Sequence, residues 1–553
     1  MLTKSFRILR LTYPRETFET LRRLPMRRGC LRQLPRDRGR YNPNAEAEQA
    51  IPLITPAQMR AMEQRYFDET GTPSIDLMER AAEALLRCIQ LSLRGKWRVS
   101  IACGPGGNGG DGYALARLLA QRLGWDCALY PSEPPKTPDA IENRRRALEM
   151  GIPERSPREG EAPDLWVDAL YGTGLSRAPE GAAAALIERM NADRQEGAST
   201  IAVDIPSGLN GTTGKAFSPC VRADQTITFQ FAKTGLCMQD GLDMCGMLDV
   251  ADIGIPAEFH PAITATLMTT KDPLSVLPSK PRNAHKGTNG RLLIVAGSVG
   301  MAGAAMLCAR AALRSGAGLV TVACPASIVP ILQVLAPCAM CLPLPERDGA
   351  ISAEAVEPLA AALRSADAAV CGCGLSRRAA PEVLRLMLEC GVPTLFDADG
   401  LNLIAADASL KALLRPHHLI TPHPGEAARL LGRPVTDPIA DALALQALGC
   451  QALLKGATTV IPVGDVPWLS ARGDCGMAKG GSGDCLSGLA GSLMAQYAAA
   501  GTAMTGEALA RCAAVASELH GRAGEFAQVQ FGPRGMCAED LVNALPRALQ
   551  GDE

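Results

Sequence analysis

Short apolar runs alternate with helical segments along most of this 553-residue chain. In the first half, the apolar runs that we interpret as strands lie at 98–103, 127–130, 164–168, 200–204 and 226–231. Segments with helical periodicity lie at 113–123, 139–150 and 181–192, after two earlier helices that begin at Thr55 and near 75. Strands that alternate with helices predict a parallel, doubly wound sheet covered by helices.

A proline-rich stretch at 256–290 separates this pattern from a second one, and we interpret it as a linker. The strands predicted after it lie at 291–296, 318–323, 367–371, 393–397, 418–421, 451–454 and 458–463. The helices predicted after it lie at 302–315, 380–390, 425–431, 483–498 and 506–523. The sequence therefore predicts two α/β domains, 49–270 and 271–550, which agrees with the number expected from the length.

The composition argues against two classes of protein. The formal net charge is −1, whereas a general nucleic-acid binder normally carries a strongly basic domain. No apolar stretch is long enough to span a membrane. Residues 1–40 hold 12 Lys and Arg against three Asp and Glu, without the apolar stretch and small-residue cleavage site of a secretory signal. We expect residues 1–48 to form a basic, disordered extension, with a transit peptide or translated sequence upstream of the real start as alternatives.

The 19 cysteines are scattered, several of them singly within apolar runs, where cysteine acts as a small hydrophobic residue. This indicates reduced thiols and a cytoplasmic protein. The six histidines show no metal-binding spacing such as His-Glu-x-x-His, so a transition-metal enzyme is not indicated.

A glycine-rich segment follows the predicted strand at 98–103. Residues 104–112 contain six glycines, together with Asn108 and Asp111. Glycines let the backbone approach a ligand, and the first amides of the next helix face an anion, so the segment predicts a phosphate-binding turn. A tight turn between strand and helix is the alternative.

Two further strands of the first half end in carboxylates, Asp168 and Asp204, and each is followed by glycines. A lone Asp at a strand end is usually a cap, but ligands bind outside the carboxyl ends of parallel strands. We therefore expect the three segments to form one site. Their Asn, Asp and Ser oxygens suit a hard cation.

These segments resemble the epimerase domain of NAD(P)H-hydrate repair enzymes, which interconverts the R and S forms of hydrated NADH and NADPH beside a potassium ion. The resemblance rests on residues 105–112, 167–170 with 172–174, and 203–208. It implies a Rossmann-like sheet, a potassium ion on Asn108, Asp168 and Ser207, and Asp204 as the catalytic residue that handles the proton at the epimerising carbon. The substrate contacts that it implies are Gly107, Asn108, Gly109, Gly110, Asp111, Gly172, Thr173, Gly174, Leu175, Ser176, Arg177 and Ala178, with Asp204 beside them. One position departs from the family, because Gly107 stands where a second Asn is usual and lacks its side-chain amide.

The clearest motif of the second half is Gly480-Gly481-Ser482-Gly483-Asp484. Glycines at a helix start direct amides toward a transferring phosphoryl group, and Asp484 can accept a hydroxyl proton. The alternative is an Asp that caps a helix. Upstream, Lys455 and the residues to Thr459 join two predicted strands and can hold a nucleotide phosphate, although the pattern is not a Walker loop.

Three more loops follow strands of the second half. They contain Gly374, the pair Asp397 and Asp399, and His423 between two prolines. Together with residues 285–287, 300–305, 311–320, 455–456 and 480–484, these loops resemble the ribokinase-like fold and, within it, the ADP- or ATP-dependent NAD(P)H-hydrate dehydratases.

This second resemblance implies that a nucleotide phosphorylates the hydroxyl of the S-hydrate, after which phosphate leaves and the reduced nicotinamide reforms. Asp484 is then the catalytic base, and Ala304, Gly374 and His423 contact the substrate. The nucleotide, which we expect to be ADP with ATP as the alternative, is held by Lys455, Gly456, Ala457, Thr458, Thr459 and Gly483, and Mg²⁺ accompanies it. Cys373 and Asp474 depart from the family, which usually has Pro and Asn at these positions.

The sequence thus predicts a bifunctional enzyme whose partners are small molecules, NADHX or NADPHX and ADP, with no nucleic acid and no membrane. We expect a homo-oligomer. The first alternative is a ribokinase-like small-molecule kinase with an N-terminal nucleotide-binding domain. The second is a binding or scaffold protein in which one domain has lost its catalytic activity.

Overall fold

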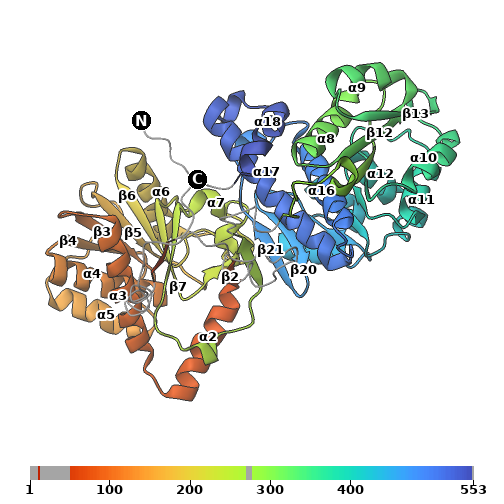
Figure 1. Ribbon diagram of the computed structural model, residues 1–553. Coiled ribbons are helices and arrows are strands. Elements are labelled where there is room, and N and C mark those ends of the chain that lie inside the picture. The colour runs from red at the N-terminus through yellow and green to blue at the C-terminus, as the bar shows by residue number, and fades with distance from the viewer. Residues whose placement is uncertain (1–9, 13–49, 269–276, 551–553) are drawn as a thin grey trace, which may run out of the picture. The chain divides into compact units, whose positions relative to one another are not determined.

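The computed structural model describes residues 10–12, 50–268 and 277–550, which divide into two compact units (Figure 1). The first unit contains Pro52–Thr264, and the second contains the described residues from Ala265 onward together with Ala50 and Ile51. The predicted extension lies outside the described residues, except for Arg10–Thr12, which form strand β1 and pair in parallel with β9 (Met247–Ala251). Both units contain mostly parallel sheets with helices, which confirms the predicted fold class.

The first unit contains a seven-stranded parallel sheet in the order β1-β9-β7-β6-β5-β3-β4. The remaining strands of this sheet are β3 (Arg98–Cys103), β4 (Asp126–Pro131), β5 (Leu165–Ala169), β6 (Ser199–Val203) and β7 (Gln225–Phe229). The chain passes from β3 outward to β4 and then returns to β5 on the other side of β3. This reversal opens a switch point between β3 and β5, where open α/β sheets bind ligands.

Helices cover both faces of this sheet (Figure 1). They are α3 (Ser74–Ser92), α4 (Gly107–Leu118), α5 (Pro138–Glu149) and α6 (Gly181–Gln195). The unit also contains α2 (Pro56–Thr70) and the short α7 (Gly241–Met244). Ile101 and Val167 pack in the cluster that contains α3 and α4, whereas their neighbours Ala102 and Trp166 pack with α6. Alternation along each strand therefore supplies one apolar layer to each face. A smaller parallel pair joins β2 (Ala50–Ile54) to β8 (Ala232–Lys233).

The predicted start of α2 is confirmed by a capping box. The Thr55 hydroxyl accepts from the amide of Gln58, and the Gln58 side chain accepts from the amide of Thr55. Pro56 occupies the first turn, where its missing N–H costs nothing.

The second unit contains its own seven-stranded parallel sheet, in the order β13-β12-β11-β16-β17-β18-β19. Its strands are β11 (Arg291–Val295), β12 (Leu319–Pro325), β13 (Met340–Leu344), β16 (Ala368–Cys371), β17 (Thr394–Phe396), β18 (His418–Ile420) and β19 (Gln451–Ala452). A two-stranded hairpin follows β13, formed by β14 (Glu346–Arg347) and β15 (Ala350–Ile351). The order reverses between β11 and β16, so this sheet has a switch point of its own.

One part of the predicted linker is a strand. Residues Ala265–Met268 form β10, which pairs in parallel with β21 (Val466–Ser470), and β21 pairs with β20 (Thr459–Val463) in antiparallel fashion. The linker interpretation is therefore wrong for these four residues. Their short apolar run lies among prolines, and it is fixed by pairing with residues about 200 positions later in the sequence, which no local pattern reveals.

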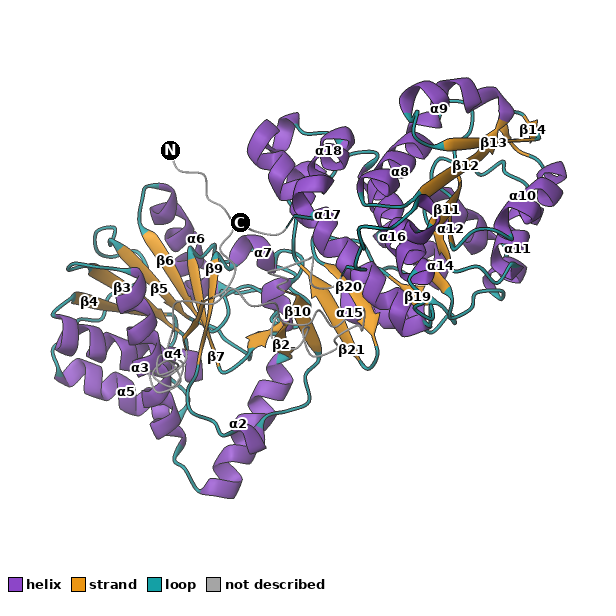
Figure 2. Ribbon diagram, viewed as in Figure 1, coloured by secondary structure: helices purple, strands orange, loops and turns teal. Residues whose placement is uncertain are grey.

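Helices cover both faces of the second sheet (Figure 2). They are α8 (Ala302–Arg314), α9 (Val329–Leu335), α10 (Val356–Leu363), α11 (Pro381–Glu389), α12 (Ala398–Ala406), α13 (Ala408–Lys411), α14 (Pro424–Leu431), α15 (Pro438–Gln446), α16 (Ser482–Ala499), α17 (Gly506–Gly535) and α18 (Ala538–Ala548).

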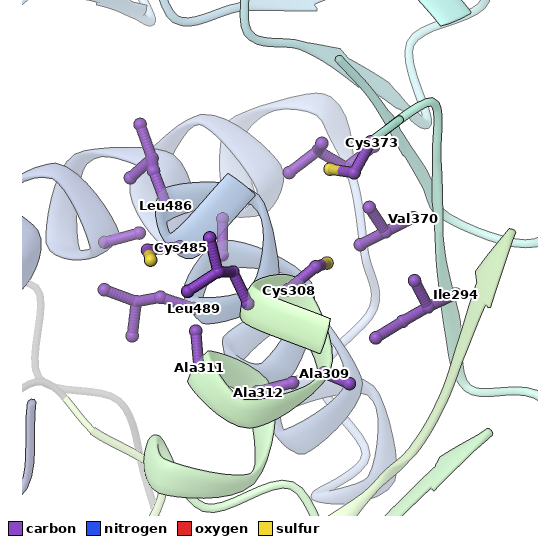
Figure 3. Close-up of a cluster of buried hydrophobic side chains, with 14 of the residues drawn as sticks. Ile294, Cys308, Ala309, Ala311, Ala312, Val370, Cys373, Cys485, Leu486 and Leu489 are labelled. Atoms are coloured by element: carbon purple, nitrogen blue, oxygen red, sulfur yellow. The ribbon is translucent and has the colours of Figure 1, made fainter. Parts of the chain in front are cut away.

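The centre of this unit is the contact between α8 and α16. Figure 3 shows side chains of both helices packed beside Ile294 of β11 and Val370 of β16. A Cβ atom at Gly488 of α16 would lie 2.1 Å from the carbonyl oxygen of Cys308 on α8. The two backbones are therefore closer there than any side chain allows.

The cysteines of the described residues form no disulfide. Cys338 and Cys341 are separated by two residues, which is the Cys-x-x-Cys spacing, and both are free thiols. No helix in the described ranges is both long and apolar enough to cross a membrane.

Candidate active sites at the two switch points

The glycine-rich segment after β3 is mostly helix. We predicted the helix from residue 113, but α4 begins at Gly107, so residues 107–112 form its first turns. Glycine disfavours helix interiors, yet the packing here requires it. A Cβ atom at Gly109 would lie 1.9 Å from the carbonyl oxygen of Gly104, and one at Gly112 would lie 2.7 Å from the Ala169 side chain. These glycines let the N-terminus of α4 approach the ends of β3 and β5.

Gly107 differs from its neighbours. A Cβ atom at this position would meet nothing within 4 Å, so a larger side chain has room. Packing therefore does not require glycine at this position.

Asp168 and Ser207 are brought into direct contact beneath this turn, and both are fully buried. The Asp168 carboxylate accepts from the Ser207 amide at 2.7 Å and from the Ser207 hydroxyl at 2.6 Å. It also accepts from the amide of Leu170 at 3.2 Å. Burial raises the pKa of Asp168 to about 6, although these hydrogen bonds lower it.

Asn108 and Asp204 lie on either side of Gly172. A Cβ atom at Gly172 would lie 3.1 Å from Oδ1 of Asn108 and 3.2 Å from Oδ2 of Asp204. The Nδ2 group of Asn108 donates to the carbonyl of Val203 at 3.3 Å, which turns its oxygen toward this point. The three predicted segments therefore meet at the switch point. The other predicted contacts, residues 173–178, lie in the loop between β5 and α6, where the Thr173 carbonyl accepts from Arg60 of α2.

Asp204 has a φ of 63°, in the left-handed region that residues other than glycine seldom occupy and that is enriched at functional sites. Its Oδ1 atom accepts from Lys233 Nζ at 2.6 Å and from the Thr228 hydroxyl at 2.9 Å. Our sequence reasoning missed Lys233 and its neighbour Glu63. The available signal was a lysine that follows the apolar run at 226–231 directly after Ala232.

In the second unit, Asp484 lies in the first turn of α16, after Gly481 with a φ of 94°. The pKa of Asp484 is raised to about 6, mainly by burial and next by the charge of Asp397, although the Cys373 thiol and Lys455 act in the opposite direction. The carboxyl group is therefore poised to exchange a proton near neutral pH.

Lys455, which is partly buried, and the buried Asp397 form an ion pair beside this helix start, with Nζ 2.7 Å from Oδ1. The other oxygen of Asp397 accepts from the Ser487 hydroxyl at 2.7 Å. A Cβ atom at Gly483 would lie 3.3 Å from Lys455 Nζ, so the ammonium group reaches the amides that open α16. Burial lowers the pKa of Lys455, but Asp397 and Glu426 outweigh it, and the pKa lies above its ordinary value.

The predicted nucleotide loop turns back on itself, because Leu454 and Val460 exchange backbone hydrogen bonds of 2.9 and 3.0 Å. Within it Gly456 and Ala457 are exposed, and Thr458 is buried. The loop is thus a short hairpin with Lys455 at its base.

His423 is the N-cap of α14, since its Nδ1 atom accepts from the amide of Gly425 at 3.0 Å. Its side chain is 52% exposed, so the ring serves the helix and still faces solvent. Glu426, which sequence reasoning missed, completes the capping box by accepting from the His423 amide at 3.0 Å. Its position three residues after the cap was the signal.

Gly374 and Ala304 are adjacent across the second switch point. Gly374 has a φ of 60°, and a Cβ atom there would lie 2.9 Å from the Cβ of Ala304. The Ser298 hydroxyl donates to the Gly374 carbonyl at 2.9 Å and fixes the turn. Asp474, the second departure, accepts from the Gly476 amide at 2.8 Å, a bond that Asn also forms.

Among the described residues, no group of three or more His, Cys, Asp or Glu side chains is arranged to hold a metal ion. A cation at either site therefore needs ligands of other kinds, such as hydroxyl, amide or carbonyl oxygens or a bound phosphate.

Two family models match this chain, the YjeF-related protein N-terminus over residues 74–235 and NAD(P)H-hydrate dehydratase over residues 292–547. The bifunctional NAD(P)H-hydrate repair enzyme Nnr of Moorella thermoacetica is 38% identical over 528 residues, which cover 91% of this chain and 97% of that protein. The Nnr of Escherichia coli is 36% identical over 502 residues, which cover 88% and 92%.

Among solved structures, an ADP/ATP-dependent NAD(P)H-hydrate dehydratase from Bacillus subtilis, co-crystallised with ATP and Mg²⁺, is 25% identical with a TM-score of 0.38. It covers 49% of this chain and 93% of that chain. The full-length relatives match both halves of the present sequence in one continuous alignment. The chain therefore belongs to the family of bifunctional NAD(P)H-hydrate repair enzymes.

Proposed function

We propose that this protein repairs hydrated NADH and NADPH in two steps. The first unit interconverts the R and S epimers, and the second unit dehydrates the S epimer with a nucleotide. The similarity of both halves to bifunctional repair enzymes supports the pair of activities. The observation that carries the proposal is Asp484, which lies at a glycine-opened helix start beside the Lys455–Asp397 pair.

In the second unit, the amides of Gly481 to Gly483 and Lys455 Nζ face the phosphoryl group that is transferred. Asp484 accepts the proton of the substrate hydroxyl as it attacks this group. With ADP as co-substrate, the products of the step are AMP and the phosphorylated hydrate, which then loses phosphate. When bound with the nucleotide, Mg²⁺ would neutralise charge on the phosphates.

In the first unit, Asp204 handles the proton at the epimerising carbon, and the substrate lies over the start of α4 and residues 172–178. Potassium is a hard cation that binds oxygen, and the carboxylate of Asp168, the hydroxyl of Ser207 and the amide oxygen of Asn108 fit this requirement. The buried Asp168, whose pKa is raised, supports a cation there, because a positive charge would offset its burial. When bound, the ion would add positive charge beside the anionic substrate.

The remaining expectations are proposals as well. We propose domains at 49–270 and 271–550, a homo-oligomer and a cytoplasmic location. A ribokinase-like small-molecule kinase is the alternative, and it predicts stable phosphorylated products from ordinary alcohols.

The test uses purified protein with a mixture of R- and S-hydrated NADH, K⁺, Mg²⁺ and either ADP or ATP. The absorbance of reduced nicotinamide should return for both epimers, faster with ADP. The Asp484→Asn variant should abolish this return, and its melting temperature should equal that of the wild-type protein. No return with either nucleotide, together with phosphorylation of simple alcohols, would establish the kinase instead.

A further inference from the structure

Lys233 has no exposed surface in a part of the first unit where the sequence predicted no functional residue. A lysine ammonium group is almost never fully buried unless it is paired, because desolvation of the charge is costly. Lys233 ends β8, and its backbone pairs with Ile54 of β2, so both ends of the residue are fixed.

The ammonium group of Lys233 has a hydrogen-bond acceptor for each of its three protons. It donates to Oδ1 of Asp204 at 2.6 Å, to the Thr228 hydroxyl at 2.9 Å and to the Phe229 carbonyl at 3.0 Å. The Thr228 hydroxyl in turn donates to the same Oδ1 atom of Asp204 at 2.9 Å. The three side chains form a closed ring of hydrogen bonds in which every donor is used.

The two carboxylate oxygens of Asp204 therefore have different surroundings. Oδ1 receives both bonds of the ring, whereas Oδ2 points to the site, 3.2 Å from the Cβ position of Gly172. The backbone of Asp204 also lies in the left-handed region, a conformation that persists only where surrounding contacts hold the residue. The hydrogen bonds to Lys233 and Thr228 are contacts of this kind.

We propose that Lys233 is a positioning residue for epimerisation, which holds Asp204 through Oδ1 and leaves Oδ2 free for the substrate. This inference rests on the proposed role of Asp204 in the first unit. It goes beyond that role because it assigns the orientation of Asp204 to a buried lysine.

Other charged groups also face this ring and belong to any account of its pH dependence. Glu63 and Arg60 approach from α2, and Asp111 approaches from α4. Burial raises the pKa of Glu63 to about 7, with Lys233 lowering it and Asp204 raising it. Burial and the carboxylates of Asp204 and Glu63 raise the pKa of Asp111 well above its ordinary value. Glu63 therefore titrates near neutral pH and must be controlled.

The test measures kcat and KM for epimerisation of R-hydrated NADH in the full-length protein and in Lys233→Met, together with the melting temperature of each. The variant should lose about tenfold or more in kcat, with little change in KM, because Asp204 loses the group that orients it. A lysine with only a structural role would lower kcat only in step with a loss of folded protein.

Three controls keep the result clear. Glu63→Gln, alone and combined with Lys233→Met, removes the titration of Glu63, and the loss of kcat caused by Lys233→Met should persist. Thr228→Val removes one donor to Oδ1 and one acceptor of the Lys233 ammonium group but keeps the ion pair, and it should lower kcat less than Lys233→Met does. Dehydration of purified S-hydrated NADH, which needs only the second unit, should be unchanged in all of these variants.

The possible outcomes separate two claims. If Asp204→Asn epimerises at the wild-type rate, the proposed role of Asp204 fails. If Asp204→Asn is inactive while Lys233→Met and Thr228→Val keep the wild-type kcat, the role of Asp204 stands and the positioning role of Lys233 is wrong. Should Lys233→Met prove too unstable to assay, an unchanged kcat in Thr228→Val would also overturn the proposal.

Discussion

Burial of carboxyl groups determines the chemistry of both sites at the level of single residues. Asp168 and Asp484 each have a pKa raised to about 6, mainly by burial. The sequence predicted that both residues end up at sheet edges with functional roles, because each lies in a glycine-flanked motif. It could not predict their pKa values, which depend on the depth of burial and on partners such as Ser207 and Asp397.

The raised pKa of Asp484 predicts the pH dependence of dehydration. A base must be ionised, so the rate should fall as the pH is lowered through about 6, whereas an ordinary carboxylate would keep it to about pH 4. Initial rates with pure S-hydrated NADH and saturating ADP measure this without the first site. A rate that stays constant to about pH 4.5 would contradict the assignment of Asp484 as the base.

The open space at Gly107 predicts that the missing amide can be restored. Gly107→Asn should lower the KM for R-hydrated NADH severalfold, because its Cβ atom would meet nothing within 4 Å and its amide adds a hydrogen-bonding group of about 0.5–1.5 kcal/mol. Gly109→Asn is the matched control, since its Cβ atom would lie 1.9 Å from a carbonyl oxygen, and it should abolish activity. An unchanged or higher KM in Gly107→Asn would show that this position does not contact the substrate.

At the level of helices and strands, local pattern predicted the regular elements and failed where packing decides. The strands at 98–103 and 291–295 were found from their apolar runs, and Thr55 was found from its capping chemistry. The start of α4 was missed because glycines at 107–112 are typical of loops, whereas here they permit close contact with the strand ends. Strand β10 was missed because only its pairing with distant β21 makes it a strand.

The close contact of α8 and α16 predicts a stability effect. Gly488→Ala should lower the free energy of unfolding of the second unit by about 1–3 kcal/mol or more, because its Cβ atom would lie 2.1 Å from the Cys308 carbonyl oxygen. Gly303→Ala, on α8 with open space around it, should be neutral or stabilising by up to about 1 kcal/mol. Denaturant titration of both variants checks this. Equal stability of the two would show that the helices can separate without cost.

Across the whole molecule, one arrangement occurs twice. Each unit has a parallel sheet whose strand order reverses, between β3 and β5 or between β11 and β16, and each candidate site extends from that reversal along the carboxyl ends of the neighbouring strands. The sequence predicted the two sheets and the edge that carries the residues. The strand order was not predictable from local patterns, because it is set by pairing between strands that are distant in the sequence. The two sites are built from separate sheets, so each should be inactivated independently.

This independence gives the most direct test of the central claim, that one chain carries an epimerase and a dehydratase with separate catalytic carboxylates. The measurement follows the return of reduced nicotinamide from pure R-hydrated and pure S-hydrated NADH, with ADP, Mg²⁺ and K⁺. Asp204→Asn should remain active on the S epimer and lose the accelerated return from the R epimer. Asp484→Asn should lose the return from both, and an equal mixture of the two variants should restore the return from the R epimer. The account would be contradicted if Asp204→Asn, at unchanged stability, lost the return of reduced nicotinamide from both epimers. It would also be contradicted if mixing the two variants did not restore the return from the R epimer.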